Sequence, residues 1–173
     1  MNEMNSIKDE FEKAYKEYAR GILRHAYFRV SNQEIAEDLV QETFFKAWRY
    51  IADGKSGEIK NFKAFLYKIL NNTIIDYYRG KRDTCSLEDA IEKREDIAIV
   101  EDDKEQKMDI ELEQKELRKY LSELKDEYRE ILIMRYIDDL SINEISKVLN
   151  KSSGNIRIII YRALKALKNK YEK

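Results

Sequence analysis

The scarcity of helix-breaking residues is what most limits the folds open to this chain. Its 173 residues include no proline and only five glycines. Proline interrupts helices and glycine weakens them, so a chain that nearly lacks both favours long helices. Apolar residues recur at helical spacing through both halves of the sequence, and no segment makes a convincing strand. We therefore expect an all-α protein.

The first half of the chain predicts two long helices. Apolar residues at helical spacing define the first one between Phe11 and Val30. Ser31 and Glu34 have the spacing of a capping box, which starts a second helix that runs to about Ile51. The apolar stripe of this second helix consists of Ala36, Val40, Phe44, Ala47 and Ile51.

A loop and a third helix follow. The segment Asp53–Glu58 holds two of the five glycines, which predicts a loop. Asn61 is placed to cap the third helix, which we expect to end near Gly80. The inward stripe expected for this helix consists of Phe62, Phe65, Leu66, Ile69, Thr73 and Tyr77.

Charge is unevenly distributed along the chain, although the net charge is only −1. Residues 62–82 carry a net charge of +4, residues 83–117 carry −9 and residues 150–173 carry +6. A basic stretch can neutralise phosphates, and the overall pI of about 6.1 does not report this local effect. The two basic stretches therefore predict two separate contact surfaces for nucleic acid.

The acidic stretch also suggests how the chain is divided. From Asp83 to about Met108 the helical periodicity fails and acidic residues dominate, which is typical of a solvated linker. We expect two small helical domains, residues 1–82 and 113–173, joined by an acidic linker at residues 83–112.

The C-terminal segment predicts a helix-turn-helix. Ser141 and Glu144 form a second capping box before a short helix, Ile142–Leu149. Asn150 tolerates the left-handed conformation that commonly ends a helix. Ser152 or Ser153 then caps a longer basic helix that reaches about Tyr171. A short helix, a tight turn and a longer basic helix are the order of a DNA-binding helix-turn-helix.

The last helix offers an inner and an outer side. Its inward stripe is expected to hold Ile156, Ile160, Ala163, Leu164 and Leu167. The outer side, which could reach phosphates or base edges, holds Asn155, Arg157, Ile158, Tyr161, Arg162 and Lys165. Spacing favours DNA binding, but a plain helical hairpin with a solvated lysine-rich end remains an alternative.

The third helix mixes aromatic, amide and basic side chains. Residues able to stack on or hydrogen-bond to unpaired bases are Tyr67, Asn71, Asn72, Tyr77 and Tyr78, and residues able to address the backbone are Lys63, Lys68, Arg79, Lys81 and Arg82. The competing interpretation is that most of these aromatic residues form a core stripe. Helical spacing alone slightly favours the core.

The second helix carries one acidic and amide-bearing face. Asp38, Gln41, Glu42 and Phe45 follow one another at positions i, i+3, i+4 and i+7. Such a face is usually only solvated. It could also serve as a docking face for a basic helical partner.

Several classes of function are excluded at this stage. Cys85 is the single cysteine and His25 the single histidine, so an internal disulfide is impossible and no Cys/His zinc site or other cofactor is expected. The N-terminus has no apolar signal core, and no apolar run approaches the ~20 residues that a membrane span needs. We expect a cytoplasmic protein without membrane insertion.

Three segments resemble the sigma-70 family of RNA polymerase sigma factors, and within it the extracytoplasmic-function (ECF) group. Glu37–Ile51 resembles region 2.2, Asn61–Arg82 resembles regions 2.3 and 2.4, and Leu121–Leu167 resembles region 4. They stand in the family's order and spacing and cover most of the chain. The resemblance implies a dissociable promoter-specificity subunit that is not an enzyme by itself. Its expected partners are bacterial core RNA polymerase (β′ clamp and β subunits), promoter DNA and an anti-sigma factor.

The resemblance also implies roles for particular residues. Docking on the β′ clamp helices falls to Asp38, Gln41 and Glu42, with Phe45 on the same face. Asn72 matches a position that holds a flipped non-template base of the −10 element, and the Asp53–Lys60 loop matches the specificity loop beside it. The remaining −10 contacts are assigned to Lys63, Lys68, Asn71, Arg79, Lys81 and Arg82. The −35 contacts are assigned to Asn155, Arg157, Ile158, Tyr161, Arg162 and Lys165. The acidic linker resembles the family's connector through polymerase channels.

One departure from the family pattern concerns the last helix. Family members usually continue Arg/Lys-Ser-Arg where this chain has Arg157, Ile158 and Ile159. We therefore expect two DNA-facing positions to be isoleucine, and contact there to rely on methyl packing and DNA shape.

Three alternatives to this function stay open from the sequence. The first is a stand-alone helix-turn-helix regulator, which would bind palindromic sites as a dimer. The second is a sigma factor of the toxin- or bacteriocin-gene subgroup. The third is a helical interaction protein without a DNA role, which the +6 charge of the terminal segment argues against.

Overall fold

The structure is a computed structural model and describes residues 2–84 and 116–172. The chain divides into two compact units, one mainly from the N-terminal half and one from the C-terminal half. Within the described ranges every regular element is a helix and there is no strand, so the all-α prediction is confirmed. Apart from its first two residues, the predicted acidic linker lies outside the described ranges, as does Cys85.

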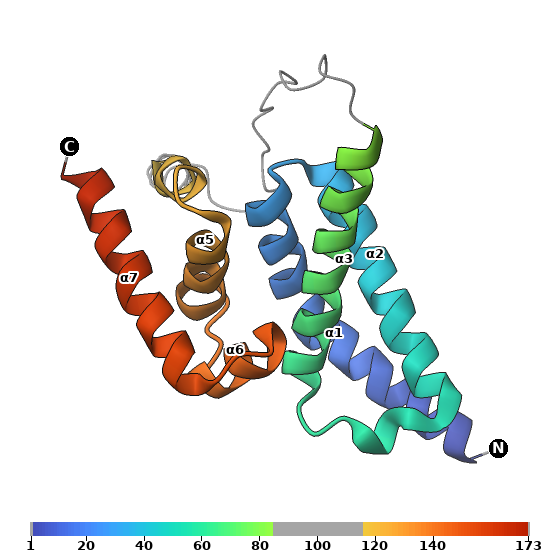
Figure 1. The fold of residues 1–173 in the computed structure, drawn as a ribbon. Coiled ribbons are helices and arrows are strands. Elements are labelled where there is room, and N and C mark those ends of the chain that lie inside the picture. Colours follow the sequence, from blue (N-terminus) through green and yellow to red (C-terminus); the bar gives the residue numbers. More distant parts are fainter. Residues whose placement is uncertain (1, 85–115, 173) are drawn as a thin grey trace, which may run out of the picture. The chain divides into compact units, whose positions relative to one another are not determined.

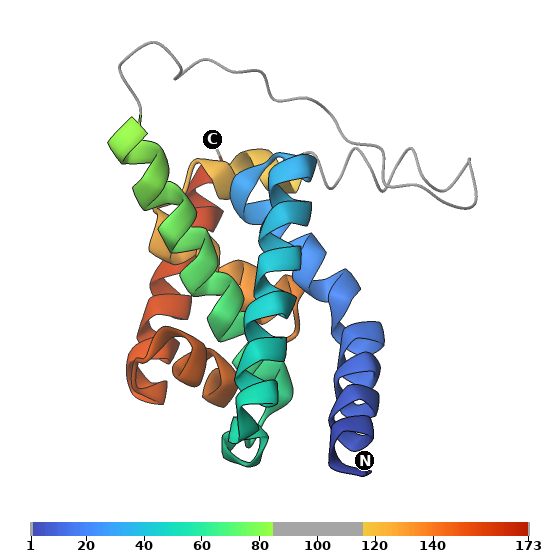
Figure 2. The same ribbon diagram turned by 90° about the vertical axis from the view of Figure 1, so that its right-hand side faces the viewer.

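Three helices form the N-terminal unit: α1 (Asn2–Val30), α2 (Gln33–Tyr50) and α3 (Phe62–Thr84). Each helix contacts the other two, so the three form one bundle (Figures 1 and 2). Their apolar faces meet in its core, as expected for amphipathic helices. All five residues of the predicted α2 stripe are buried, together with Ile22, Ala26, Leu39, Leu66, Leu70 and Ile74.

The turn between α1 and α2 corrects the first predicted cap. Ser31 is left-handed with φ 53°, and its N–H donates to the carbonyl of Tyr27 at 2.8 Å, so Ser31 ends α1. Asn32 is the N-cap instead, and its side chain accepts from the N–H of Ile35 at 3.0 Å. Asparagine caps a helix as well as serine does, so the N-cap predicted from the Ser31–Glu34 spacing was wrong by one residue.

The start of α3 was predicted correctly and its end was not. The Asn61 side chain accepts from the N–H of Ala64 at 2.8 Å, which confirms the cap. The helix runs through Gly80 to Thr84, because an exposed glycine costs a helix only about 1 kcal/mol relative to alanine.

The core face of α3 is also rotated from the predicted stripe. Tyr67, Leu70 and Ile74 are buried, whereas Phe62 and Phe65 are only half-buried. The aromatic residues at the start of this helix therefore mark its edge, and smaller aliphatic residues fill its centre.

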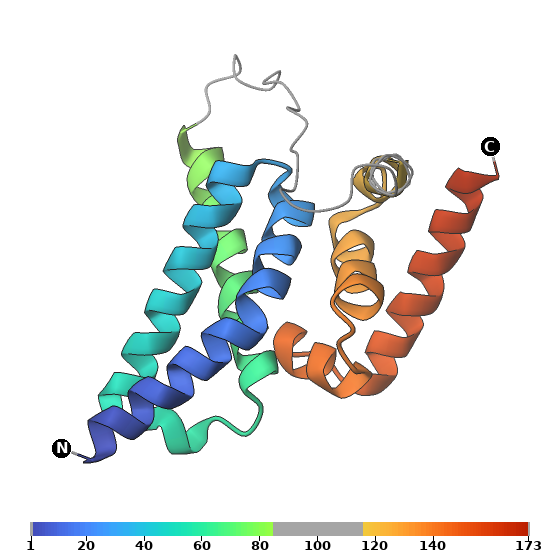
Figure 3. The ribbon, with the colours of Figure 1, turned by 180° about the vertical axis from the view of Figure 1, so that it is seen from behind.

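The C-terminal unit holds α5 (Asp126–Leu132), the π-helical turn η3 (Ile133–Ile137), α6 (Ile142–Leu149) and α7 (Ser153–Tyr171), preceded by helical residues 116–122. Helix α5 packs against α7. Helices α6 and α7 meet at a steep angle through a short turn (Figures 1 and 3). This is the geometry expected of a helix-turn-helix.

The local signals around that turn are confirmed. The hydroxyl of Ser141 accepts from the N–H of Glu144 at 3.2 Å, and the Glu144 carboxylate accepts from the N–H of Ser141 at 2.8 Å, which closes the capping box. Asn150 is left-handed with φ 52°. Ser152 caps α7 by accepting from the N–H of Asn155 at 3.2 Å.

The inward face of α7 needs two corrections. Ile159, expected to face DNA, is only 5% exposed and lies on the same side as Ile156, Ile160 and Ala163. Leu164, expected in the core, is 40% exposed. The buried residues follow the spacing i, i+3, i+4 and i+7, so the core stripe is centred differently from the prediction.

Candidate polymerase- and DNA-binding surfaces

The four residues predicted to dock polymerase lie on one exposed face of α2. Asp38, Gln41, Glu42 and Phe45 are all exposed, and Phe45 keeps 60% of its surface in solvent. The guanidinium of Arg49 lies 5.9 Å from the centre of the Phe45 ring, one turn further on. The structure therefore brings these side chains together as an accessible face with carboxylates and an aromatic ring, suited to a basic helical partner.

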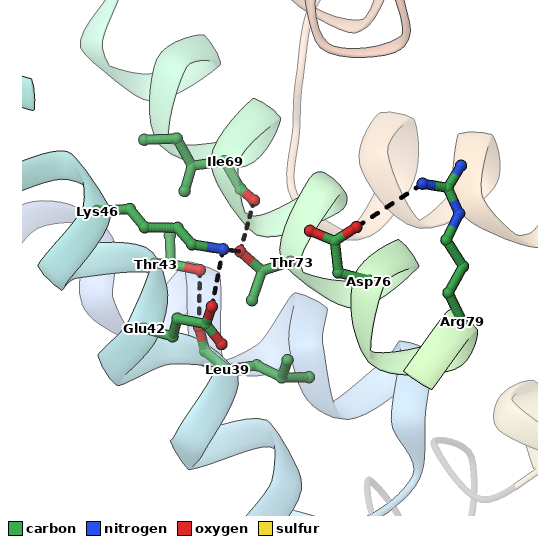
Figure 4. A network of polar contacts seen from close by, with 8 residues as sticks. All are labelled: Leu39, Glu42, Thr43, Lys46, Ile69, Thr73, Asp76 and Arg79. Atoms are coloured by element: carbon green, nitrogen blue, oxygen red, sulfur yellow. Dashed lines mark hydrogen bonds and ion pairs between the residues drawn. The ribbon is translucent and has the colours of Figure 1, made fainter. Parts of the chain in front are cut away.

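A chain of polar contacts connects this face to α3 (Figure 4). The ammonium of Lys46 lies 2.8 Å from the Glu42 carboxylate and donates to the Thr73 hydroxyl at 3.2 Å. Thr73 donates in turn to the carbonyl of Ile69 at 2.9 Å. The hydroxyl of Thr73 is thus used both as acceptor and as donor.

Lys46 and Thr73 were not among the site residues predicted from the sequence, although Thr73 was expected in the inward stripe of its helix and is buried. Glu42 and Lys46 have the i, i+4 spacing of an ion pair on a helix, so this contact could have been predicted from the sequence. The other contact of Lys46 crosses to α3, where Thr73 follows the predicted base-binding Asn72. A half-exposed pair of this kind contributes little to stability, so its main effect is to restrict the Glu42 side chain.

The residues predicted to contact the −10 element do not all reach the surface of α3. Lys68, Asn72, Arg79 and Lys81 are exposed, and Lys63 is half-buried. Arg79 lies 3.8 Å from Asp76 on the same helix (Figure 4). The side chain of Arg82 is outside the described part of the structure.

Asn71 differs from the other residues predicted to contact the −10 element. It is only 5% exposed, and its Oδ1 has no hydrogen-bond partner among the described residues. On α3 the side chain of Asn72 is therefore accessible and that of Asn71 is not.

The aromatic residues of α3 mostly serve the bundle. The buried Tyr67 ring packs edge-on against His25 at 5.5 Å. The hydroxyl of Tyr78 donates to the carbonyl of Arg29 at 2.7 Å, which joins α3 to the end of α1. Tyr77 is half-buried beside Tyr78, with 5.3 Å between the ring centres. For Tyr67 and Tyr78 the core interpretation is the one that the structure supports.

The predicted loop joins the C-terminal end of α2 to α3. It begins with a π-helical turn, η1 (Ile51–Lys55), and continues with a 3-10 turn, η2 (Ser56–Glu58). Gly54 has φ 78°, a left-handed conformation that favours glycine. Tyr50 donates from its hydroxyl to the Glu58 carboxylate at 2.5 Å. This hydrogen bond to an anion raises the pKa of Tyr50.

The outer side of α7 presents all six residues predicted to contact the −35 element. These are Asn155, Arg157, Ile158, Tyr161, Arg162 and Lys165, and every one of them is exposed. Ile158 and Tyr161 keep 51% and 69% of their surface in solvent. Of the two isoleucines expected to face DNA, only Ile158 is available for methyl packing.

The described residues include neither a metal-binding cluster nor a membrane-spanning helix. Among the described residues no cluster of His, Cys, Asp or Glu could hold a metal ion. Within the same ranges no helix is both long and apolar enough to cross a membrane.

Comparison with protein families identifies both halves of the chain. Residues 14–84 match the model of sigma-70 region 2, and residues 114–167 match that of sigma-70 region 4. Two similar proteins come from Bacillus subtilis. RNA polymerase sigma factor YlaC is 31% identical, and the match covers 96% of this chain and 94% of YlaC. ECF RNA polymerase sigma factor SigM is 30% identical, and the match covers 94% of this chain and 95% of SigM.

Solved structures share the fold. CnrH, in complex with the cytosolic domain of CnrY, has a TM-score of 0.70 at 21% identity, covering 95% of this chain and 89% of CnrH. The sigma factor RpoE from Bartonella quintana, in complex with the anti-sigma factor NepR, has a TM-score of 0.72 at 24% identity, covering 92% of this chain and 95% of RpoE.

Regions 2 and 4 in this order define a transcription initiation factor. The chain belongs to the ECF group of the sigma-70 family of RNA polymerase sigma factors. Its partners are accordingly core RNA polymerase and promoter DNA, and its function is promoter-specific transcription initiation.

Proposed function

We propose that the N-terminal unit recognises unpaired promoter DNA and the C-terminal unit recognises duplex promoter DNA. The exposed face of α2 docks on the β′ clamp, α3 captures unpaired −10 bases through Asn72, and α7 enters the major groove at the −35 element. The observation that carries this proposal is that all six α7 residues are exposed, because a buried or interrupted outer face could not follow a groove.

Reconstitution with polymerase tests the proposal directly. The purified chain would be mixed with bacterial core RNA polymerase and fragmented genomic DNA, and the 5′ ends of the transcripts sequenced. We expect start sites that share two upstream elements and that are absent when the chain is omitted. Transcripts without a shared element, or no complex with core polymerase, would refute the proposal.

Substitution of Asn72 by alanine is expected to weaken capture of unpaired −10 DNA about tenfold, since one hydrogen-bonding amide to a base is lost. Binding of the holoenzyme to fork-junction DNA, followed by fluorescence anisotropy, measures this loss. Asn169→Ala removes an exposed amide from the far end of α7 and should leave the affinity unchanged. Equal affinity of the Asn72 variant and the wild-type protein would exclude Asn72 from the site.

Substitution of Arg157 by alanine tests how α7 holds duplex DNA. If Arg157 reads a base, the loss should be about 1–3 kcal/mol and should be confined to one promoter position. If it contacts a phosphate, binding should weaken on all sequences and the salt dependence should decrease by about one unit of slope. Lys168→Ala, near the end of α7, is the control. An unchanged affinity at every salt concentration would disprove any contact.

The finer features of the protein follow from this proposal. The polymerase supplies all catalytic groups, so the chain has no enzymatic activity of its own and works in the cytoplasm beside the chromosome. Because RpoE is seen with the anti-sigma factor NepR, we propose that an anti-sigma factor also holds this chain inactive. Co-purification from the native host, with and without chromosomal neighbours of its gene, would test for such a partner.

A stand-alone helix-turn-helix regulator explains less of the molecule. It accounts for α6 and α7 but gives no role to residues 14–84, which match region 2. It also leaves the acidic face of α2 without a partner. A helical interaction protein without a DNA role fails in the same way, because the exposed arginines and lysine of α7 would then have no function.

A further inference from the structure

Tyr50 stands at the point where α2, the loop and α3 meet. Its hydroxyl donates to Glu58 at 2.5 Å, and its ring lies 5.0 Å from the ring of Phe65 on α3. The ammonium of Lys55 lies 5.5 Å from the centre of the same ring. One side chain thus contacts both turns of the loop and the helix that follows it.

The loop is largely exposed, with Ile59 half-buried near its end. Ile51 is buried at its start and Asn61 is fixed at its end as the cap of α3. Between these ends, residues 52–55, 57, 58 and 60 are exposed. A chain of exposed residues that includes two glycines has many accessible conformations, and ordering it at the moment of binding would cost free energy.

The contacts of Tyr50 limit that freedom. A hydrogen bond from a hydroxyl to a carboxylate is short and stronger than a neutral one, and 2.5 Å is within its usual range. Tyr50 is the last residue of α2 and its ring lies against Phe65, so Glu58 is linked through Tyr50 to both α2 and α3. A cation above the ring adds a weaker attachment at Lys55.

We propose that Tyr50 is a positioning residue for promoter specificity: by holding Glu58 it keeps the Asp53–Lys60 loop in the one conformation that distinguishes the captured base. This inference rests on the proposed capture of −10 bases beside that loop. Tyr50 itself does not touch the DNA. Its effect is to let the loop meet the base already ordered, which sharpens discrimination among bases more than it raises overall affinity.

The test compares base preference in Tyr50→Phe and in the wild-type holoenzyme. The probe is fork-junction DNA whose unpaired non-template bases are randomised, and sequencing of bound DNA gives the enrichment of each base at each position. Phenylalanine keeps the ring against Phe65 and removes only the hydroxyl. We expect the preference at one captured base to decrease about three- to tenfold, while binding to core polymerase and the thermal midpoint stay unchanged.

Four further variants sharpen the result. Tyr15→Phe is the matched control, because its ring packs on Phe44 at 4.7 Å and its hydroxyl has no hydrogen-bond partner among the described residues. Glu58→Ala should reproduce the loss, and Glu58→Gln, which keeps an oxygen acceptor, should preserve most of the preference. The Tyr50→Phe and Glu58→Ala double variant should lose no more than either single one, because both remove the same bond.

Each outcome decides the inference. An unchanged base profile in Tyr50→Phe overturns it, and so does a uniform loss of affinity with the profile intact, since that would reveal only a stabilising role. If Tyr50→Phe does not fold, the Glu58→Ala profile decides by the same criteria. Failure of the proposed function looks different, because the wild-type holoenzyme would then show no base preference and Asn72→Ala would change nothing.

Discussion

Reversing the charge of Glu42 is expected to reduce affinity for core RNA polymerase about 100-fold. The Glu42→Lys substitution would place a cation on a face that we propose meets a basic helix, and like charges brought together at an interface cost several kcal/mol. It would also remove the partner of Lys46 and set two cations one turn apart, so the Thr73 contact would be lost as well. Titration of labelled protein with core polymerase measures the change.

The chain contains a matched control for this substitution. Glu12 and Lys16 on α1 form an ion pair with the same i, i+4 spacing, at 3.6 Å, and Glu12 is exposed to a similar extent as Glu42, 58% against 51%. Glu12→Lys changes the net charge equally and breaks an equivalent pair outside the proposed interface. If both variants bound core polymerase equally well, the acidic face of α2 would be only a solvated surface.

Local signals in the sequence were sufficient for most helix boundaries. Asn61, Ser141 and Ser152 cap their helices through hydrogen bonds to residues three positions away, so nothing outside the segment is needed to predict them. Ser31 failed because its neighbour Asn32 is an equally good cap, and the choice depended on which residue would adopt a positive φ.

The residues that link separate elements could not be found in the same way. Tyr50 and Glu58 are joined across a loop whose conformation no short spacing encodes. Lys46 reaches Thr73 only because α2 and α3 pack side by side with their registers fixed by the core. The exposed residues of α2 and α7 were predictable, since helical spacing separates the faces of a helix. Asn71 and Asn72 were not distinguishable by type, and only the packing of α3 buries the first and exposes the second.

The two adjacent isoleucines of α7 show where the resemblance misled. The family pattern suggested that Ile158 and Ile159 both replace polar residues that face DNA. Successive helical residues point about 100° apart, so the boundary between the buried and the exposed face of a helix can fall between two neighbours. The buried set Ile156, Ile160 and Ala163 includes Ile159 at helical spacing and leaves Ile158 outside it.

This difference predicts opposite results for the same substitution at neighbouring positions. Ile159→Arg would force a cation into the core of the helix-turn-helix, where it loses packing and has no room to be hydrated. We expect a loss of stability of about 3 kcal/mol or more in the C-terminal unit. Hydrogen exchange of α5 and α7 peptides, followed by mass spectrometry, would show this loss locally, and −35 binding would disappear with the fold.

Ile158→Arg should behave as a surface change, because Ile158 is 51% exposed. Its effect on stability should remain within about 0.5 kcal/mol, while a new cation on the outer face should strengthen duplex binding and increase the salt slope by about one. The two substitutions at neighbouring positions therefore distinguish an effect on folding from an effect on DNA recognition. If Ile159→Arg were tolerated and bound DNA more tightly than the wild-type protein, the face of α7 that meets the major groove would be the one that packs against α5 in this structure.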